Sequence, residues 1–148
     1  MRRQRGSALV EFALGAVFLV GLFIGIFQFG YSFYLYNTLE SAVRGAAQYA
    51  ALETYPGSTA SLPECFAERV RNVAVSGNPN DGSQPVLPGL TAANVSVTMN
   101  FSNGAPSTVT VGIGSYVMNA VLHSYSLVNK PQVTMPYLGR WAKDGGCS

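Results

Sequence analysis

One long uncharged stretch near the N-terminus limits the folds that are open to this chain. No residue from Phe12 to Leu39 carries a formal charge, and Phe12 to Phe27 is apolar throughout if glycine is counted. About 20 helical residues cross the hydrocarbon core of a bilayer, so the stretch is long enough to span one. Three arginines, Arg2, Arg3 and Arg5, precede it. The positive-inside bias therefore predicts a cytoplasmic N-terminus and places the remainder of the chain outside.

The net charge of +2 comes from this basic leader, residues 1–6. Without its three arginines, six basic residues face seven acidic ones, so the rest of the chain is close to neutral. No basic patch remains, and the electrostatic footprint of a nucleic-acid-binding protein is absent. Charged residues make up only 11% of the chain, well below the proportion usual in soluble domains.

Glu11 is the residue that fits a plain membrane anchor least. A carboxylate in a spanning helix costs roughly 2.5–3.5 kcal/mol at mid-bilayer and less near the edge, and such groups are functional hypotheses by default. If the chain is cut after Gly6, Ser7 becomes the first residue and Glu11 the fifth. A new amino group would then start a hydrophobic helix, four residues before the carboxylate.

The residues around this point resemble the processing site of type IV pilins and pseudopilins. In those proteins a prepilin peptidase cuts after a glycine and a glutamate follows at the fifth mature position, which Gly6 and Glu11 match. Further residues narrow the resemblance to the TadE family, minor pseudopilins of the Tad (tight adherence) pilus. They lie in three segments: Ala8–Leu14, Gly25–Tyr31 and Ala42–Ala50. The resemblance covers residues 5–52, returns weakly at Pro131–Met135, and is lacking between those regions.

The resemblance implies a processing and assembly site at Gly6, Ser7, Glu11 and Phe12. It implies four partners: a prepilin peptidase, other pilins and minor pseudopilins, an inner-membrane assembly platform, and the lipid bilayer. The subunit would cross the inner membrane once, with a periplasmic C-terminal domain, and could later join an extracellular adhesive filament. There Glu11 would neutralise the N-terminal ammonium of a neighbour and so select its register, the best-attested use of a buried polar pair. Alternatively, Glu11 only orients the chain for the peptidase or for assembly.

Other interpretations of the hydrophobic stretch stay open. A secretory signal peptide has an apolar stretch of about 7–15 residues, shorter than this one. Gly45–Ala47 nevertheless resembles a signal-peptidase site, and cleavage there would release a secreted hydrolase. A plain signal anchor would give an uncleaved, membrane-anchored periplasmic accessory or binding protein. Such a protein would have no need of Glu11.

Two pairs of residues carry further expectations. Gly21 and Gly25 form a GxxxG spacing, which lets membrane helices approach closely, although glycine is frequent in such helices anyway. Cys65 and Cys147 both lie in the part expected outside the cytoplasm, where an even number of cysteines favours one disulfide over two free thiols. Its loop of roughly 80 residues would contribute roughly 4 kcal/mol in the chain-entropy model.

The pattern beyond the apolar stretch predicts an α+β fold. Tyr31, Tyr34 and neighbouring aromatic residues are typical of an outer membrane interface. The helix is expected to continue to about Leu52 as an amphipathic stalk, because apolar residues recur at three- and four-residue steps. A second helix is predicted at about residues 62–76, with Ser61 as its N-cap and Glu64 completing a capping box.

Alternating apolar and polar residues predict strands. The expected strands cover residues 95–101, 109–113 and 132–138. Asn103-Gly104 predicts a hairpin turn, which Pro106 is expected to lengthen, and residues 116–127 fit either an extension of the second strand or a short helix. The chain is thus divided into a cleaved leader (1–6), a transmembrane and stalk helix (7–52) and an extracytoplasmic domain (53–148). That domain would pack three or four antiparallel strands on the stalk, as pilins do.

The sequence offers little chemistry. It has no nucleophile elbow, phosphate-binding glycine loop or metal-ligand cluster. His123 is the only histidine, and Ser124 and Ser126 beside it cannot form a triad by adjacency alone. We therefore expect no cofactor, no metal, no nucleic acid and no enzymatic activity.

Overall fold

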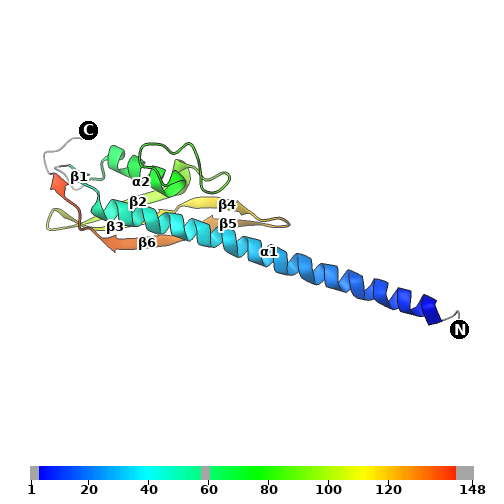
Figure 1. The fold of residues 1–148 in the computed structure, drawn as a ribbon. Helices are drawn as coiled ribbons and strands as arrows, with labels where there is room; N and C mark the ends of the chain where they lie inside the picture. The colour runs from blue at the N-terminus through cyan, green and yellow to red at the C-terminus, as the bar shows by residue number, and fades with distance from the viewer. Residues whose placement is uncertain (1–3, 58–60, 143–148) are drawn as a thin grey trace.

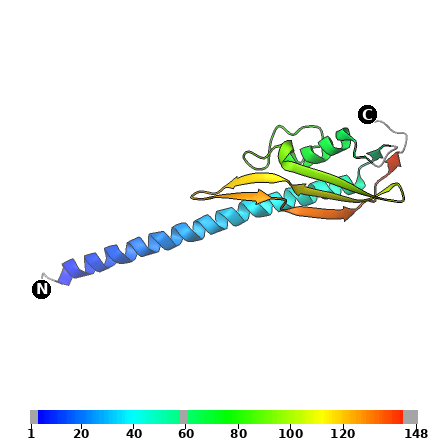
Figure 2. The same cartoon turned by 180° about the vertical axis from the view of Figure 1, so that it is seen from behind.

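A single long helix, α1 (Gln4–Leu52), dominates the molecule. The computed structural model describes residues 4–57 and 61–142. A small domain packs on the C-terminal half of α1, and the N-terminal half projects from it as a bare rod (Figures 1 and 2). The 49 residues of α1 contain no proline, and at 1.5 Å per residue they extend about 70 Å. The expected α+β class, a long N-terminal helix on a small antiparallel sheet, is confirmed.

The C-terminal half of α1 buries one face. Its fully buried residues follow the helical repeat, and most of them are alanines, which let α2 and the sheet come close to the helix axis. They are Leu39, Val43, Ala46, Ala47 and Ala50. On the solvent side, Arg44 and Glu40 form an i, i+4 ion pair at 3.2 Å. Such exposed pairs contribute only a few tenths of a kcal/mol, so burial of the apolar face is what holds the domain on α1.

Helix α2 (Glu64–Ser76) packs across the buried half of α1 through Phe66 and Val70. Its N-cap is Pro63, which makes no side-chain cap bond. The expectation of a Ser61 N-cap with a capping box is therefore wrong. Ser61 instead lies before the helix, where its carbonyl accepts a hydrogen bond from the Tyr55 hydroxyl. Gly77 ends α2 with a φ of 77°, a conformation that a residue without a Cβ adopts freely.

Three strands make the main sheet, in the order β2-β3-β6, and every pair is antiparallel. They are β2 (Val95–Ser102), β3 (Ala105–Ile113) and β6 (Gln132–Pro136). Val109, Val111 and Ile113 of the central strand are fully buried, because β3 has a neighbour on each side and α1 on one face.

The turn between β2 and β3 has only two residues, Asn103 and Gly104, with φ values of 53° and 77°. Positive φ at both positions is the geometry that matches the twist of a hairpin. Pro106 does not lengthen this loop, contrary to the expectation. It lies within β3 opposite Phe101, where the register shifts. Such an irregularity tolerates a residue that has no N–H to donate.

The segment that the sequence left ambiguous forms a second hairpin, β4 (Ser115–Asn119) with β5 (Ser124–Val128). Neither expectation, an extended strand or a short helix, is correct. The chain leaves the main sheet at Gly114, whose N–H donates to the Asn94 carbonyl at 2.8 Å. Tyr116 and Met118 then point inward while Val117 is exposed, which is the two-residue period of a strand. The hairpin extends along α1 toward its N-terminal half (Figures 1 and 2).

A short parallel pair, β1 (Tyr55–Pro56) with β7 (Trp141–Ala142), closes the domain beside the end of α1. The Tyr137 hydroxyl lies at the centre of this closure. It accepts the Tyr55 N–H at 2.9 Å, and its single proton is shared between the carbonyls of Glu53, at 2.8 Å, and Arg140, at 2.9 Å. The end of the described chain is thereby joined to the residues that follow α1.

Candidate functional site

The expected processing and assembly residues all lie on the bare half of α1. Gly6, Ser7, Glu11 and Phe12 are exposed and helical. Ser7 and Glu11 are four residues apart, which puts them on one face of the helix with a rise of about 6 Å between them. The helix passes through Gly6 without interruption, so residues 6 and 7 lie in the first turns of α1.

Glu11 is the one charged residue between Ser7 and Leu39. Among the side chains that the structure describes, which begin at Gly6, no ion pair includes it. Among its neighbours on the helix surface, Ser7 is polar, whereas Ala8, Leu14 and Gly15 are exposed and carry no polar side chain. A carboxylate in such surroundings is costly in a low-dielectric medium unless a cation lies beside it. Any such cation must come from outside the described part of this subunit.

The bare half of α1 exposes large apolar side chains along its length. Phe12 and Phe18 are each 74% exposed and Phe29 is 75% exposed. Soluble monomers rarely expose apolar surface of this extent. From Gly6 to Leu52 the helix is long and apolar enough to cross a membrane, by length and composition. The bare half of α1 therefore needs lipid or other apolar helices around it.

Gly21 and Gly25 lie on this bare half too. A Cβ added at either position would meet nothing within 4 Å. No contact with the residues that the structure describes accounts for their spacing, so a packing role would require a second helix.

The expected disulfide has one end in the described residues. Cys65 lies half-buried in the first turn of α2. Cys147 lies outside the described residues, and the bond between them stays a prediction.

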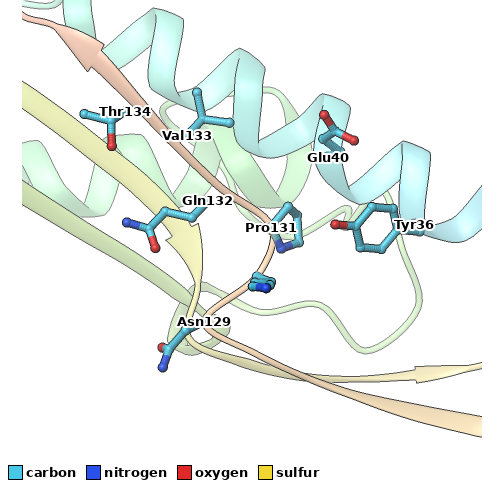
Figure 3. Close-up of a pocket in the computed structure, with 8 residues that line it drawn as sticks. Tyr36, Glu40, Asn129, Pro131, Gln132, Val133 and Thr134 are labelled. Carbon is cyan, nitrogen blue, oxygen red and sulfur yellow. The ribbon is translucent and has the colours of Figure 1, made fainter.

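A polar depression of about 460 Å³ lies where β6 leaves the β5–β6 connection and meets α1 (Figure 3). Pro131 faces the ring of Tyr36 across it, and Glu40 lies one helical turn further along (Figure 3). Its two charged residues are Glu40 and Lys130. Glu40 is already paired with Arg44, so this depression does not present an unpaired carboxylate for acid–base chemistry. In the described residues, no three side chains of the His, Cys, Asp and Glu types come together as a metal site.

Sequence reasoning overlooked one residue of α1. Gln28 is the only polar side chain between Phe12 and Tyr31, and that isolation was a signal. Its Oε1 accepts the N–H of Leu122, at the tip of the β4–β5 hairpin, at 2.9 Å. Its Nε2 is buried with no hydrogen-bond partner among the described residues. Gln28 thus fixes where the hairpin tip lies along α1.

Comparison with known proteins agrees with the N-terminal half. Residues 6–48 match the family model described as TadE-like protein. The matched range begins at Gly6, includes Glu11, and ends in the buried part of α1. No curated protein and no solved structure matches the chain. The match confirms the TadE resemblance over residues 6–48, and the helix that contains them is long and apolar enough to cross a membrane.

Proposed function

We propose that this chain, whose residues 6–48 match the TadE-like family model, is a minor pseudopilin of a Tad-type adhesive pilus. A prepilin peptidase cuts it after Gly6, and the mature subunit takes part in the assembly or structure of the filament. The observation that carries this proposal is Glu11. It is a lone carboxylate on a bare apolar helix, four residues after the position where the mature chain would begin.

Cleavage after Gly6 gives Glu11 a partner. It creates an ammonium group at Ser7, which would be costly to bury unpaired among packed apolar helices. A neighbouring subunit shifted along the filament brings its own Glu11 next to that ammonium. Each carboxylate then neutralises the amino group of the next subunit, and the pair selects the axial register.

The surroundings of α1 change during this sequence of events. The three arginines of the leader hold the N-terminus in the cytoplasm, and the domain lies on the periplasmic side of the inner membrane. Lipid covers the bare half of α1 before assembly. Neighbouring helices replace lipid once the assembly platform moves the subunit into the filament. The buried half of α1, Leu35 to Ala51, keeps the same intramolecular packing throughout.

N-terminal sequencing of sheared surface filaments is the direct test. A mature chain that begins at Ser7 supports the proposal. A surface-exposed chain that retains Arg2 to Gly6 would favour the alternative function, an uncleaved membrane-anchored accessory or binding protein.

Glycine replacements supply the matched control. Gly6→Ala is expected to block cleavage and to leave the precursor in the inner membrane. Gly15→Ala makes the same change on the same exposed helix, where an added Cβ also meets nothing within 4 Å, and should be processed normally. Equal processing of both variants would contradict cleavage after Gly6.

A further inference from the structure

The tip of the β4–β5 hairpin reaches a level of α1 that belongs to the apolar stretch. The N–H of Leu122 donates to the Gln28 side chain at 2.9 Å, which sets this level. Residues of the tip and of α1 line one apolar hollow of about 380 Å³ between them. They are Phe23, Ile24, Phe27, Gln28, Val121 and Leu122. The apolar surface of the bare helix therefore continues without interruption onto the hairpin tip.

The chemistry of the tip resembles that of the helix surface beside it. Val121 is 59% exposed and Leu122 is 68% exposed. No charged residue lies between Asp81 and Lys130, so the whole hairpin is free of formal charge. The turn is closed by a hydrogen bond from the Ala120 N–H to the His123 carbonyl at 3.0 Å. Two backbone N–H groups of the tip, those of Ala120 and Leu122, are thus hydrogen-bonded within the chain, and its side chains at 121 and 122 are apolar, which suits a segment at the boundary of a bilayer.

The depth of the tip follows from the numbering of the helix. A span of about 20 residues that starts near Ala8 ends near Phe27. Tyr31 and Tyr34, which suit the headgroup level, lie further along α1. The tip contacts Phe23 to Gln28, which is about 5–12 Å closer to the membrane centre than Tyr31 at 1.5 Å per residue.

We propose that the hairpin tip, Ala120 to His123, inserts into the outer leaflet of the membrane that α1 spans, so that the subunit has a second contact with lipid. This inference rests on the proposed function for the membrane span itself. Val121 and Leu122 lie in the acyl boundary, and the contact sets the rotation and tilt of α1 before assembly. An anchored rod alone would leave the domain free to turn about the helix axis.

Single-tryptophan chains in vesicles test the depth. The native chain has one tryptophan, Trp141, in β7 at the end of the domain away from the bare half of α1 (Figure 1). In a Trp141→Phe background, Leu122→Trp probes the tip and Phe18→Trp probes the span. Val117→Trp is the matched control, an exposed position on β4 about 13 Å from the tip at 3.3 Å per residue. Each full-length chain is reconstituted with phosphatidylcholine brominated either near the headgroup end or deep in the acyl chains.

The Leu122→Trp probe should lose roughly half of its fluorescence to shallow bromines and less to deep ones, as expected 5–10 Å into the headgroup and acyl boundary. Phe18→Trp should respond most to deep bromines, whereas Val117→Trp and native Trp141 should respond to neither. Val121→Trp repeats the test at the tip if Leu122→Trp does not fold. An unquenched tip with a quenched Phe18→Trp overturns the inference and leaves the span intact. If Phe18→Trp is also unquenched, the membrane span of the proposed function fails as well.

The protein-to-lipid ratio distinguishes lipid from a protein partner as the molecule that covers the tip. Quenching of the Leu122→Trp probe should stay constant as the protein-to-lipid ratio rises. Quenching that falls with rising ratio would mean that another copy of the chain covers the tip, and would overturn lipid as its occupant.

Discussion

At the scale of single residues, two polar side chains on the same apolar helix have different partners. Gln28 finds one within the chain, since its Oε1 accepts the Leu122 N–H. Glu11 forms no ion pair with any residue that the structure describes. An ionised group costs far more than an amide to leave unpaired at low dielectric. Under the proposed function the pairing of Glu11 therefore depends on assembly, whereas that of Gln28 does not.

The charge of Glu11 can be separated from its size. Glu11→Gln keeps the shape but cannot neutralise an ammonium, so we expect a subunit that is cleaved after Gly6 yet absent from filaments. Immunoblots of membrane and sheared-filament fractions measure both steps. Glu40→Gln, which removes an exposed carboxylate from the same helix, should assemble normally. An uncleaved Glu11→Gln precursor would instead assign Glu11 to recognition by the peptidase.

The Tyr137 hydroxyl joins three backbone groups at the end of the domain. Tyr137→Phe should lower the free energy of unfolding by about 1 kcal/mol, the usual net value of one hydrogen bond. Urea unfolding of the full chain in detergent, followed by Trp141 fluorescence, measures it. Tyr34→Phe is the control, because Tyr34 is 62% exposed on α1. Equal midpoints for both variants would contradict a stabilising role for Tyr137.

At the scale of elements, the sequence predicted the helix and strands that have a periodic residue pattern. It missed the features that are set by contacts with residues distant in the sequence. The end of α1 at Leu52 and strands β2 and β3 follow from helical and alternating patterns, so their placement was close. The N-cap of α2 was missed because Ser61 is held by Tyr55, a tertiary contact that no local motif contains. The β4–β5 hairpin was missed because its break at Gly114 is set by Asn94, twenty positions earlier in the chain. The site at Glu11 was predicted from a charge where none is expected, and it stays a prediction.

The division of α1 into a buried and a bare half predicts different responses to one substitution. Leu39→Ala removes a fully buried side chain between α2 and the sheet and should cost about 2–5 kcal/mol of unfolding free energy. Leu14→Ala makes the same change where the side chain is 71% exposed and should leave the domain unaffected. Urea unfolding in detergent compares them. Similar losses would mean that the bare half is also part of the folded core.

The disulfide is a prediction about how the domain is closed. The β1–β7 pair brings Ala142 next to Gly57, shortly before α2 and Cys65. Five residues reach at most about 17 Å from Ala142 to Cys147. Non-reducing peptide mapping of protein from the periplasmic side should recover a Cys65–Cys147 cross-linked peptide. Cys147→Ser should lower the unfolding free energy by about 2–5 kcal/mol in oxidising buffer and have no effect after reduction of both chains. Free thiols at both cysteines would contradict the bond.

At the scale of the whole molecule, four tyrosines set how the domain responds to alkali: Tyr55 and Tyr116 are buried, and Tyr49 and Tyr137 are partly buried. Burial, aided by a hydrogen bond to Glu53, raises the pKa of Tyr49 to about 12. Burial also raises the pKa of Tyr55, Tyr116 and Tyr137 above the ordinary value. A raised pKa means that the unfolded chain loses these protons first. Their contribution to the free energy of unfolding is therefore complete below about pH 10 and is lost as the pH rises toward 12.

Alkaline unfolding should show this window. These tyrosines should leave the urea midpoint of the full chain in detergent unchanged up to about pH 10 and should lower it at higher pH. Tyr49→Phe should make the fall shallower, since phenylalanine has no proton to lose. A midpoint that falls equally in both chains would show that Tyr49 does not contribute.

Because α1 is unbroken, the axial position of a subunit beside its neighbour and the direction in which its domain faces are linked. Each residue of an α-helix turns the chain by about 100°, and α1 has no proline at which that phase could be lost. The residue of α1 that lies opposite a neighbouring subunit therefore also determines how far the domain is rotated about the helix axis. A one-residue slip at Glu11 would carry the β4–β5 tip about a quarter of the way around the axis. A contact at Glu11, inside an assembly, can thus determine how the exposed surface of the domain is oriented about the helix axis.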